Sequence, residues 1–84
     1  MTLHADISLT ETAEGAFLLD RITGDCFALN KVGLNIWQHL SQGRGPEDIL
    51  DLVAREFDDV PRDTLSRDID TFIAALEQRS LLTR

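Results

Sequence analysis

Few side chains in this sequence suit nucleophilic or metal chemistry, and the candidates are His4, Cys26 and His39. A structural zinc site needs four ligands, usually in closely spaced pairs, and these residues form no such pair. Cys26 and His39 could act as nucleophile and base, but a catalytic base needs an oriented partner, and none is evident. Cys26 is better explained as a small apolar residue, which suits a strand that faces a helix. We expect His4 in a flexible segment, His39 in a solvated position, and neither a metal nor a cofactor.

The acidic residues form local groups that could suggest acid catalysis or cation binding. These groups are Glu47–Asp48, Asp58–Asp59 and the set of Asp63, Asp68 and Asp70. Most carboxylates of this kind belong to helix N-termini and solvated faces. The glycines of the segment GRGP, at 43–46, do not form a phosphate loop, because the lysine and the following Ser or Thr are missing. The sequence predicts no catalytic residue and therefore a protein that is not an enzyme.

Length and charge narrow the classes of partner. With 84 residues the chain predicts one domain over 1–84, because a chain of this size supports a single small core. Its 15 acidic and 8 basic residues give a formal net charge of −7, and the cations are spread evenly along the sequence. A polyanion is repelled unless the cations gather on one face, so no nucleic-acid partner is expected.

The sequence also bears on localisation. The first residues lack the basic segment and apolar block of a signal peptide. The sequence also has no run of about 18 apolar residues, the length that is needed to cross a membrane. The single cysteine, Cys26, cannot form an internal disulfide. We expect a cytoplasmic protein without membrane contact.

The segment Gly24–Leu40 marks a change from strands to helices. Apolar residues alternate before it, as strands require, whereas Ile36, Trp37 and Leu40 keep helical spacing. Asn30 stands where the period changes, and its side chain can accept a hydrogen bond from a free amide of the first helical turn. Asn30 is therefore the predicted N-cap and the junction between sheet and helices.

Three strands are predicted before Asn30. They cover Leu3–Leu9, Ala16–Asp20 and the residues up to Leu29, with a polar connection over Thr10–Gly15. A three-residue turn over 22–24 would pair residues of like character across the second hairpin; the pairs are Phe17 with Leu29, Leu19 with Phe27 and Arg21 with Asp25. These would be the hydrogen-bonded pairs. The backbone N–H and C=O of Cys26 and Ala28 would then face away from the second strand.

Three amphipathic helices follow. The first runs over Lys31–Gln42, the second starts at Pro46, and the third opens at Asp63 or Thr64. The apolar residues that repeat along the third helix are Leu65, Ile69, Phe72, Ile73 and Leu76, and Leu81 and Leu82 complete the core. Together the elements predict an α+β fold that is winged helix-turn-helix-like, with a three-stranded antiparallel sheet followed by three helices.

The pattern LNKVGLNIWQHL, after a hairpin with a TGD turn and before two amphipathic helices, resembles the small PqqD-like proteins that recognise peptide precursors. The resemblance spans residues 7–82, and its most specific positions are Leu29, Asn30, Gly33, Ile36, Trp37 and Leu40. Among these proteins the chain is most similar to the free-standing leader-peptide-binding proteins of lasso-peptide biosynthesis. The resemblance implies that the partner is the leader of a ribosomally made precursor, presented to separate processing enzymes, a leader protease and a cyclase.

Strand addition along Cys26 and Ala28 is the predicted mode of binding, with pockets between this strand and the third helix. The candidate peptide-binding residues are Asp25, Cys26, Phe27, Ala28, Leu29, Asp68, Thr71, Phe72 and Ala75. Phe72 fits the core equally well, and Phe27, Leu29, Ile69 and Ile73 are expected in the core. The open edge could also be capped by a second copy, so the chain is expected to be a monomer or a weak dimer.

A winged-helix DNA-binding regulator is the alternative function, since the turn between the second and third helices has a suitable length. Charge argues against it. The first half of the third helix carries Asp63, Asp68 and Asp70 against only two cations, Arg62 and Arg67. A recognition helix needs cations near phosphates.

Overall fold

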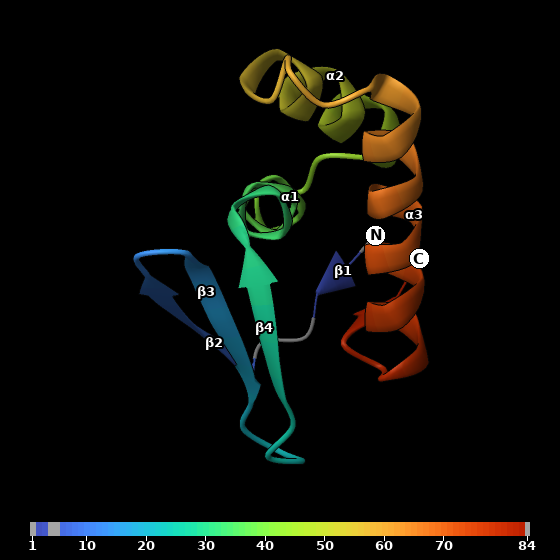
Figure 1. The fold of residues 1–84 in the computed structure, drawn as a ribbon. Helices are drawn as coiled ribbons and strands as arrows, with labels where there is room; N and C mark the ends of the chain where they lie inside the picture. The colour runs from blue at the N-terminus through green and yellow to red at the C-terminus, as the bar shows by residue number, and fades with distance from the viewer. Residues whose placement is uncertain (1, 4–5, 84) are drawn as a thin grey trace.

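The computed structural model describes residues 2–3 and 6–83. Three strands form an antiparallel sheet in the order β2-β3-β4, and three helices follow in sequence (Figure 1). The strands are β2 (Ile7–Thr12), β3 (Gly15–Asp20) and β4 (Cys26–Asn30). The helices are α1 (Lys31–Ser41), α2 (Pro46–Glu56) and α3 (Arg62–Gln78). This arrangement confirms the predicted α+β fold class.

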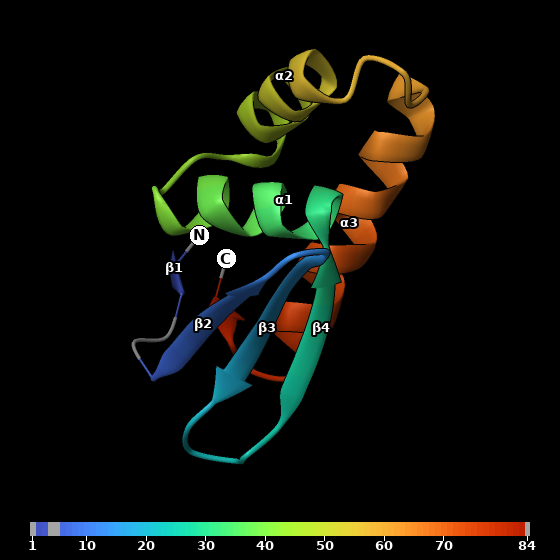
Figure 2. The same cartoon turned by 60° about the vertical axis from the view of Figure 1, so that its left-hand side comes forward.

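The helices cover the sheet from one side and one end. α1 crosses near the end of β4 and packs against β3 and β4, while α3 runs alongside β4 (Figures 1 and 2). α2 lies beyond α1 and packs against both other helices. Among the described residues, no helix has both the length and the apolar content to cross a bilayer.

A second, two-stranded sheet joins the two ends of the described chain and was not predicted. β1 (Thr2–Leu3) pairs antiparallel with β5 (Leu82–Thr83), so that Leu3 lies opposite Leu82. The predicted single strand over Leu3–Leu9 is therefore wrong, because its two ends belong to different sheets. His4 lies outside the described residues.

The first hairpin is tighter than the sequence indicated. β2 continues to Thr12 and β3 begins at Gly15, so most of the expected connection over Thr10–Gly15 is strand. Gly15 also lies directly against β4. A Cβ atom at this position would stand 1.8 Å from the carbonyl oxygen of Leu29. Any side chain there would push β4 away, so glycine is required for the close approach of these strands.

The register of the second hairpin differs by one residue from the prediction. Leu18 lies opposite Phe27 and Ala16 opposite Leu29, which leaves four residues, 21–24, in the turn. The carboxylate of Asp20 accepts hydrogen bonds from the backbone N–H groups of Ile22 (2.9 Å) and Thr23 (3.4 Å). The backbone carbonyl oxygen of Asp20 also accepts a hydrogen bond from the Gly24 N–H (2.8 Å). These bonds favour the longer turn, and the sequence argument about like residues did not include them.

The shift of register changes which side chains of β3 face the core. Ala16 and Leu18 are buried, whereas Phe17 and Leu19 are 46% and 40% exposed on the outer face of the sheet. Opposed residues of a sheet share a face, so Cys26 and Ala28 also lie on that outer face. The predicted pairing of Phe17 with Leu29 and of Leu19 with Phe27 is therefore wrong.

The junction at Asn30 has the predicted structure. The Asn30 Oδ1 atom accepts a 2.8 Å hydrogen bond from the Gly33 N–H, which caps the first turn of α1. Ile36, Trp37 and Leu40 are buried, as their spacing predicted. His39 is not solvated as expected: it is half-buried, with its Nδ1 atom 3.1 Å from an Arg44 guanidinium nitrogen.

The core lies between the sheet and the three helices. α3 starts at Arg62, slightly earlier than predicted, because Pro61 can precede a first helical turn without losing a needed donor. Its inward residues Leu65, Ile69, Ile73 and Leu76 are buried, and so are Leu81 and Leu82. Two residues expected in the core, Phe27 and Leu29, are only half-buried. They lie at the border between the core and the edge of the sheet.

Candidate functional site

The edge strand β4 turns backbone hydrogen-bonding groups away from the sheet. The Asp20 N–H donates to the Asp25 carbonyl oxygen (2.9 Å), and the Arg21 N–H donates to the Asp6 carbonyl oxygen (3.0 Å). Hydrogen-bonded and non-bonded positions alternate along an antiparallel pair. The backbones of Phe27 and Leu29 therefore face β3. Those of Cys26 and Ala28 face outward, where no strand of the described residues pairs with them.

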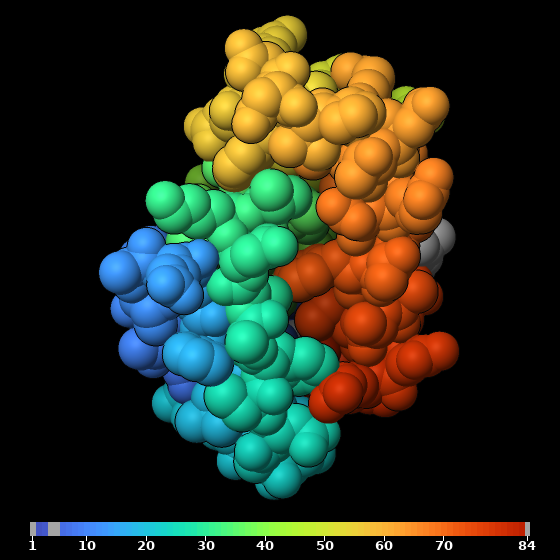
Figure 3. Space-filling model, viewed as in Figure 1, coloured from blue at the N-terminus to red at the C-terminus, as the bar shows by residue number. Residues whose placement is uncertain are grey.

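A groove of about 340 Å³ lies between this edge and α3. In the space-filling view it is the hollow between the teal surface of β4 and the orange and red surface of α3 (Figure 3). Residues of β4, α1 and α3 line it, namely Ala28, Leu29, Asn30, Val32, Gly33, Ile36, Asp68, Thr71, Phe72 and Ala75. Most of these side chains are apolar, and the polar ones lie on the rim.

Six of the nine predicted site residues line this groove. Ala28 and Leu29 form the strand side, and the helix side consists of Asp68, Thr71, Phe72 and Ala75, which share one face of α3. Phe72 is half-buried and packs against the core as well as lining the groove, so its position is compatible with both of its predicted roles. A smaller hollow of about 130 Å³ adjoins the groove, and Phe27 lines it together with Phe72 and Ala75.

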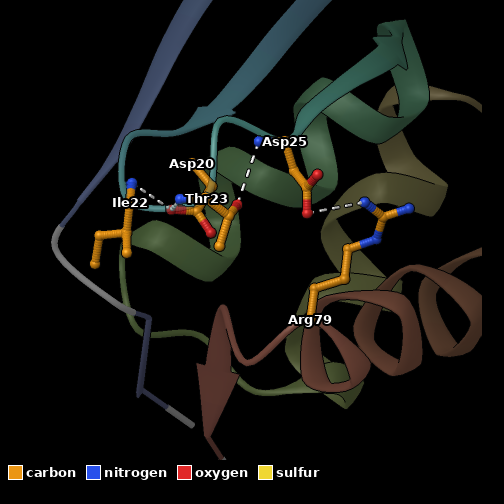
Figure 4. Close-up of polar contacts among 5 residues, drawn as sticks. All are labelled: Asp20, Ile22, Thr23, Asp25 and Arg79. Atoms are coloured by element: carbon orange, nitrogen blue, oxygen red, sulfur yellow. Dashed lines mark hydrogen bonds and ion pairs between the residues drawn. The ribbon is translucent and has the colours of Figure 1, made fainter.

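Asp25 and Cys26 lie outside both hollows. The Cys26 side chain is exposed on the outer face, so the expectation that it faces a helix is wrong, and only its backbone adjoins the groove edge. Asp25 forms an ion pair with Arg79 at the C-terminal end of α3, 3.7 Å between Oδ2 and a guanidinium nitrogen (Figure 4). Both side chains are about half exposed, so the pair contributes little to stability.

Sequence reasoning missed the α1 wall of the groove and the position of Arg79 against Phe27 and Asp25. Asn30, Val32, Gly33 and Ile36 enter the site because α1 starts directly where β4 ends. A strand that continues into a helix without a loop must bring the first turn of that helix to the strand edge. This geometric signal was present in the sequence. Arg79 had no comparable signal, since its position depends on where α3 ends relative to β4.

Polar chemistry at the groove is limited. Asp68 is exposed at the rim and has no hydrogen bond or ion pair with another described residue. Within the described part of the chain, no group of three His, Cys, Asp or Glu residues is arranged to hold a metal ion. The arrangement offers backbone donors and acceptors, apolar pockets and one carboxylate. Such a set is suited to holding an extended peptide.

An antiparallel sheet whose edge strand β4 lies beside a helix, followed by three helices, defines the class of this protein, a winged-helix-like α+β domain. Residues 15–82 match the family model described as "Coenzyme PQQ synthesis protein D (PqqD)". The chain belongs to the PqqD family. The predicted PqqD-like recognition element is thereby confirmed.

Two solved structures are similar over almost the entire chain. One is described as "TbiB1 in Complex with the TbiA(beta) Leader Peptide", with 34% identity, a TM-score of 0.82, and coverage of 98% of this chain and 94% of that chain. The other is described as "Lasso peptide synthetase B1 complexed with the leader peptide", with 29% identity, a TM-score of 0.80, and coverage of 99% and 96%. None of the curated proteins compared with the chain matches it.

Proposed function

We propose that this chain is a non-catalytic binding module that captures the leader of a ribosomally synthesised precursor peptide by adding it as a strand to β4. The observation that carries the proposal is the outer edge of β4, which pairs with no other strand of the described residues, with the outward backbones of Cys26 and Ala28 beside an apolar groove next to α3. The similarity to two proteins in complex with leader peptides supports the same conclusion.

Strand addition divides the work of recognition between backbone and side chains. The N–H and C=O groups of Cys26 and Ala28 can bond to any extended peptide and so provide affinity without selection. Leader residues opposite Phe27 and Leu29 would point to the α3 side, where Phe72 and Ala75 provide apolar contacts. The shape of these pockets would then choose among leaders.

The same geometry leaves the outer face of the sheet free for presentation of the leader. Leader residues opposite Cys26 and Ala28 would lie on that face, next to the exposed side chains of Phe17 and Leu19. A separate leader protease and a cyclase would meet the bound peptide there. We place this step in the cytoplasm, where ribosomes make the precursor.

Fluorescence anisotropy with a synthetic leader, taken from the precursor encoded beside this protein, tests the proposal. Saturable binding is expected, with a scrambled leader as the control. Precursor incubated with this protein alone should give no cleaved or cyclised product by mass spectrometry. Any such product would contradict a non-catalytic role. Light scattering with and without leader measures whether a second copy caps the edge in the free state.

A gel-shift titration at low salt addresses DNA binding, and no shift is expected. The basic residues near the start of α3 are few, and Arg62 already forms an ion pair with Asp51 (2.5 Å). A specific shift combined with absent leader binding would favour a regulator instead.

A further inference from the structure

We propose that Arg79 binds a carboxylate side chain of the leader, four residues after the leader residue that lies opposite Leu29. The proposal rests on strand addition to β4 and adds the chemistry of one leader position to it. The relevant site lies beyond the residues that line the groove: Arg79, which follows the last residue of α3, contacts Phe27 of β4 and Asp25 just before β4.

The guanidinium of Arg79 is held in place mainly by an aromatic ring. Its Cζ atom lies 4.1 Å from the centroid of the Phe27 ring, a distance typical of a cation–π contact. This contact restricts the guanidinium, while 48% of the Arg79 side chain stays exposed and available to a ligand. An arginine oriented in this way loses less freedom on binding a carboxylate than a freely rotating one.

The hydrogen-bonding capacity of this guanidinium is largely unused. Its ion pair with Asp25 spans 3.7 Å, which is too long for a hydrogen bond. Among the described residues, the guanidinium of Arg79 has no closer acceptor, although an arginine offers five N–H donors. Figure 4 shows Arg79 extended from α3 towards Asp25. A ligand carboxylate could approach the same edge and form two parallel hydrogen bonds.

Strand geometry determines which leader residue reaches Arg79. Residues opposed across an antiparallel pair share a face of the sheet. Leader residues opposite Leu29, Phe27 and Asp25 therefore point to the α3 side, and in an antiparallel leader they are residues i, i+2 and i+4. The first two meet the apolar surface formed with Phe72 and Ala75.

Leader residue i+4 lies close to Arg79, because Asp25, the residue directly opposite i+4, forms an ion pair with the Arg79 guanidinium. An acidic side chain there would share or replace the contact with Asp25. The leader preference is thus two apolar residues at i and i+2 followed by Asp or Glu at i+4. Asp25 is the competing anion in the free protein, so its carboxylate should weaken leader binding rather than strengthen it.

The test is an amide scan of the leader. Each Asp or Glu of the fluorescein-labelled synthetic leader is changed singly to Asn or Gln, and anisotropy is measured with the parent protein and with Arg79→Gln. One substitution, at the residue four positions after the one opposite Leu29, should weaken binding to the parent protein about tenfold, as expected for a charge-assisted hydrogen bond. Arg79→Gln should weaken binding of the parent leader equally and should cause no further loss with that amide leader.

Matched variants separate this effect from a general change of charge or fold. Arg55→Gln removes an exposed cation from α2, away from the groove, and should leave affinity unchanged. Arg79→Lys keeps the charge without the planar fork and should give an intermediate loss, while Asp25→Asn should tighten binding about twofold. Arg79→Glu should recover affinity for a leader with Lys at the same position. Circular dichroism melting confirms that each variant is folded.

The outcomes are distinguishable. If the parent protein binds the leader but no amide substitution weakens binding, or if Arg79→Gln weakens every amide leader as much as the parent leader, the assignment of Arg79 is wrong. Strand addition remains supported in that case. If the parent protein does not bind the leader at all, the proposed function fails and this assignment fails with it.

Discussion

The backbone N–H of Asp20 donates a 2.9 Å hydrogen bond to the carbonyl oxygen of Asp25, and this bond determines which groups of β4 face the open edge. Because hydrogen-bonded and non-bonded pairs alternate from this pair onward, the backbone N–H and C=O groups of Phe27 and Leu29 face β3. Those of Cys26 and Ala28 face the open edge. The sequence-based register paired Asp25 with Arg21 instead, the residue that follows the end of β3. Because only the β3 partners change, the same two β4 residues face outward in both registers.

Proline at position 28 should separate leader binding from folding. Ala28→Pro removes an N–H that faces outward, a position where strands tolerate proline. We expect the melting temperature to change by only a few degrees and leader affinity to fall by about tenfold or more, because one intermolecular hydrogen bond is lost and docking is hindered. Anisotropy and circular dichroism measure the two effects.

Phe27→Pro is the matched control on the neighbouring residue. It removes an N–H that faces β3 and a half-buried ring that packs against the core, so a loss of about 3 kcal/mol of folding free energy is expected. If Ala28→Pro unfolds the protein, the alternation is wrong. If it folds and binds leader normally, strand addition is wrong. Hydrogen exchange at the Cys26 and Ala28 amides should slow only when leader is added, and this measurement shows whether the alternation or the strand addition is wrong.

Helical periodicity predicted the helices well because apolar residues at helical spacing form one face of each helix, and that face must pack against the single small core. It also placed Asp68, Thr71, Phe72 and Ala75 on one face, which the groove confirms. Asn30 was identified because a capping side chain at a change of period has a local physical signature, and the 2.8 Å bond to Gly33 has this geometry.

The strands were harder to predict, because alternation does not say which parity faces the core. On β3 both parities are apolar: Phe17 and Leu19 form one, and Ala16 and Leu18 the other. The choice depends on the turn, where the Asp20 carboxylate accepts backbone hydrogen bonds. The pairing of β1 with β5 joins residues about eighty positions apart, and no local pattern records such a contact.

The observed parity of β3 makes a direct prediction about stability. Leu18 is 1% exposed and Leu19 is 40% exposed, so Leu18→Ala should lose about 2–5 kcal/mol of folding free energy and Leu19→Ala less than about 1 kcal/mol. Urea denaturation of the two variants measures both values. Equal losses, or a larger loss for Leu19→Ala, would show that the outer face of the sheet is covered in solution.

The cap at Asn30 should contribute to stability through a single acceptor oxygen. Asn30→Ala leaves the Gly33 N–H without its partner and should cost about 1 kcal/mol. Asn30→Asp keeps the oxygen and adds a negative charge at the positive end of α1, so it should recover the loss. Chemical denaturation measures both variants. A full loss in Asn30→Asp would mean that the amide group of Asn30 acts in some way other than capping.

Bulk in the groove should block the leader without disturbing the core. Ala75 and Ala74 are neighbours on α3 and both are exposed, but only Ala75 lines the groove. Ala75→Trp should weaken leader binding at least about tenfold, because the indole occupies the space beside Phe72, whereas Ala74→Trp should bind as the parent does. Both variants should keep their folding free energy to within about 1 kcal/mol, since neither position is in the core.

Asp68→Arg, at the rim of the same groove, should also weaken binding. The comparison is made by anisotropy with one leader, after circular dichroism has shown that the three variants are folded. Equal affinity for Ala75→Trp and Ala74→Trp would place the leader on another surface, and the groove between β4 and α3 would then have no part in recognition.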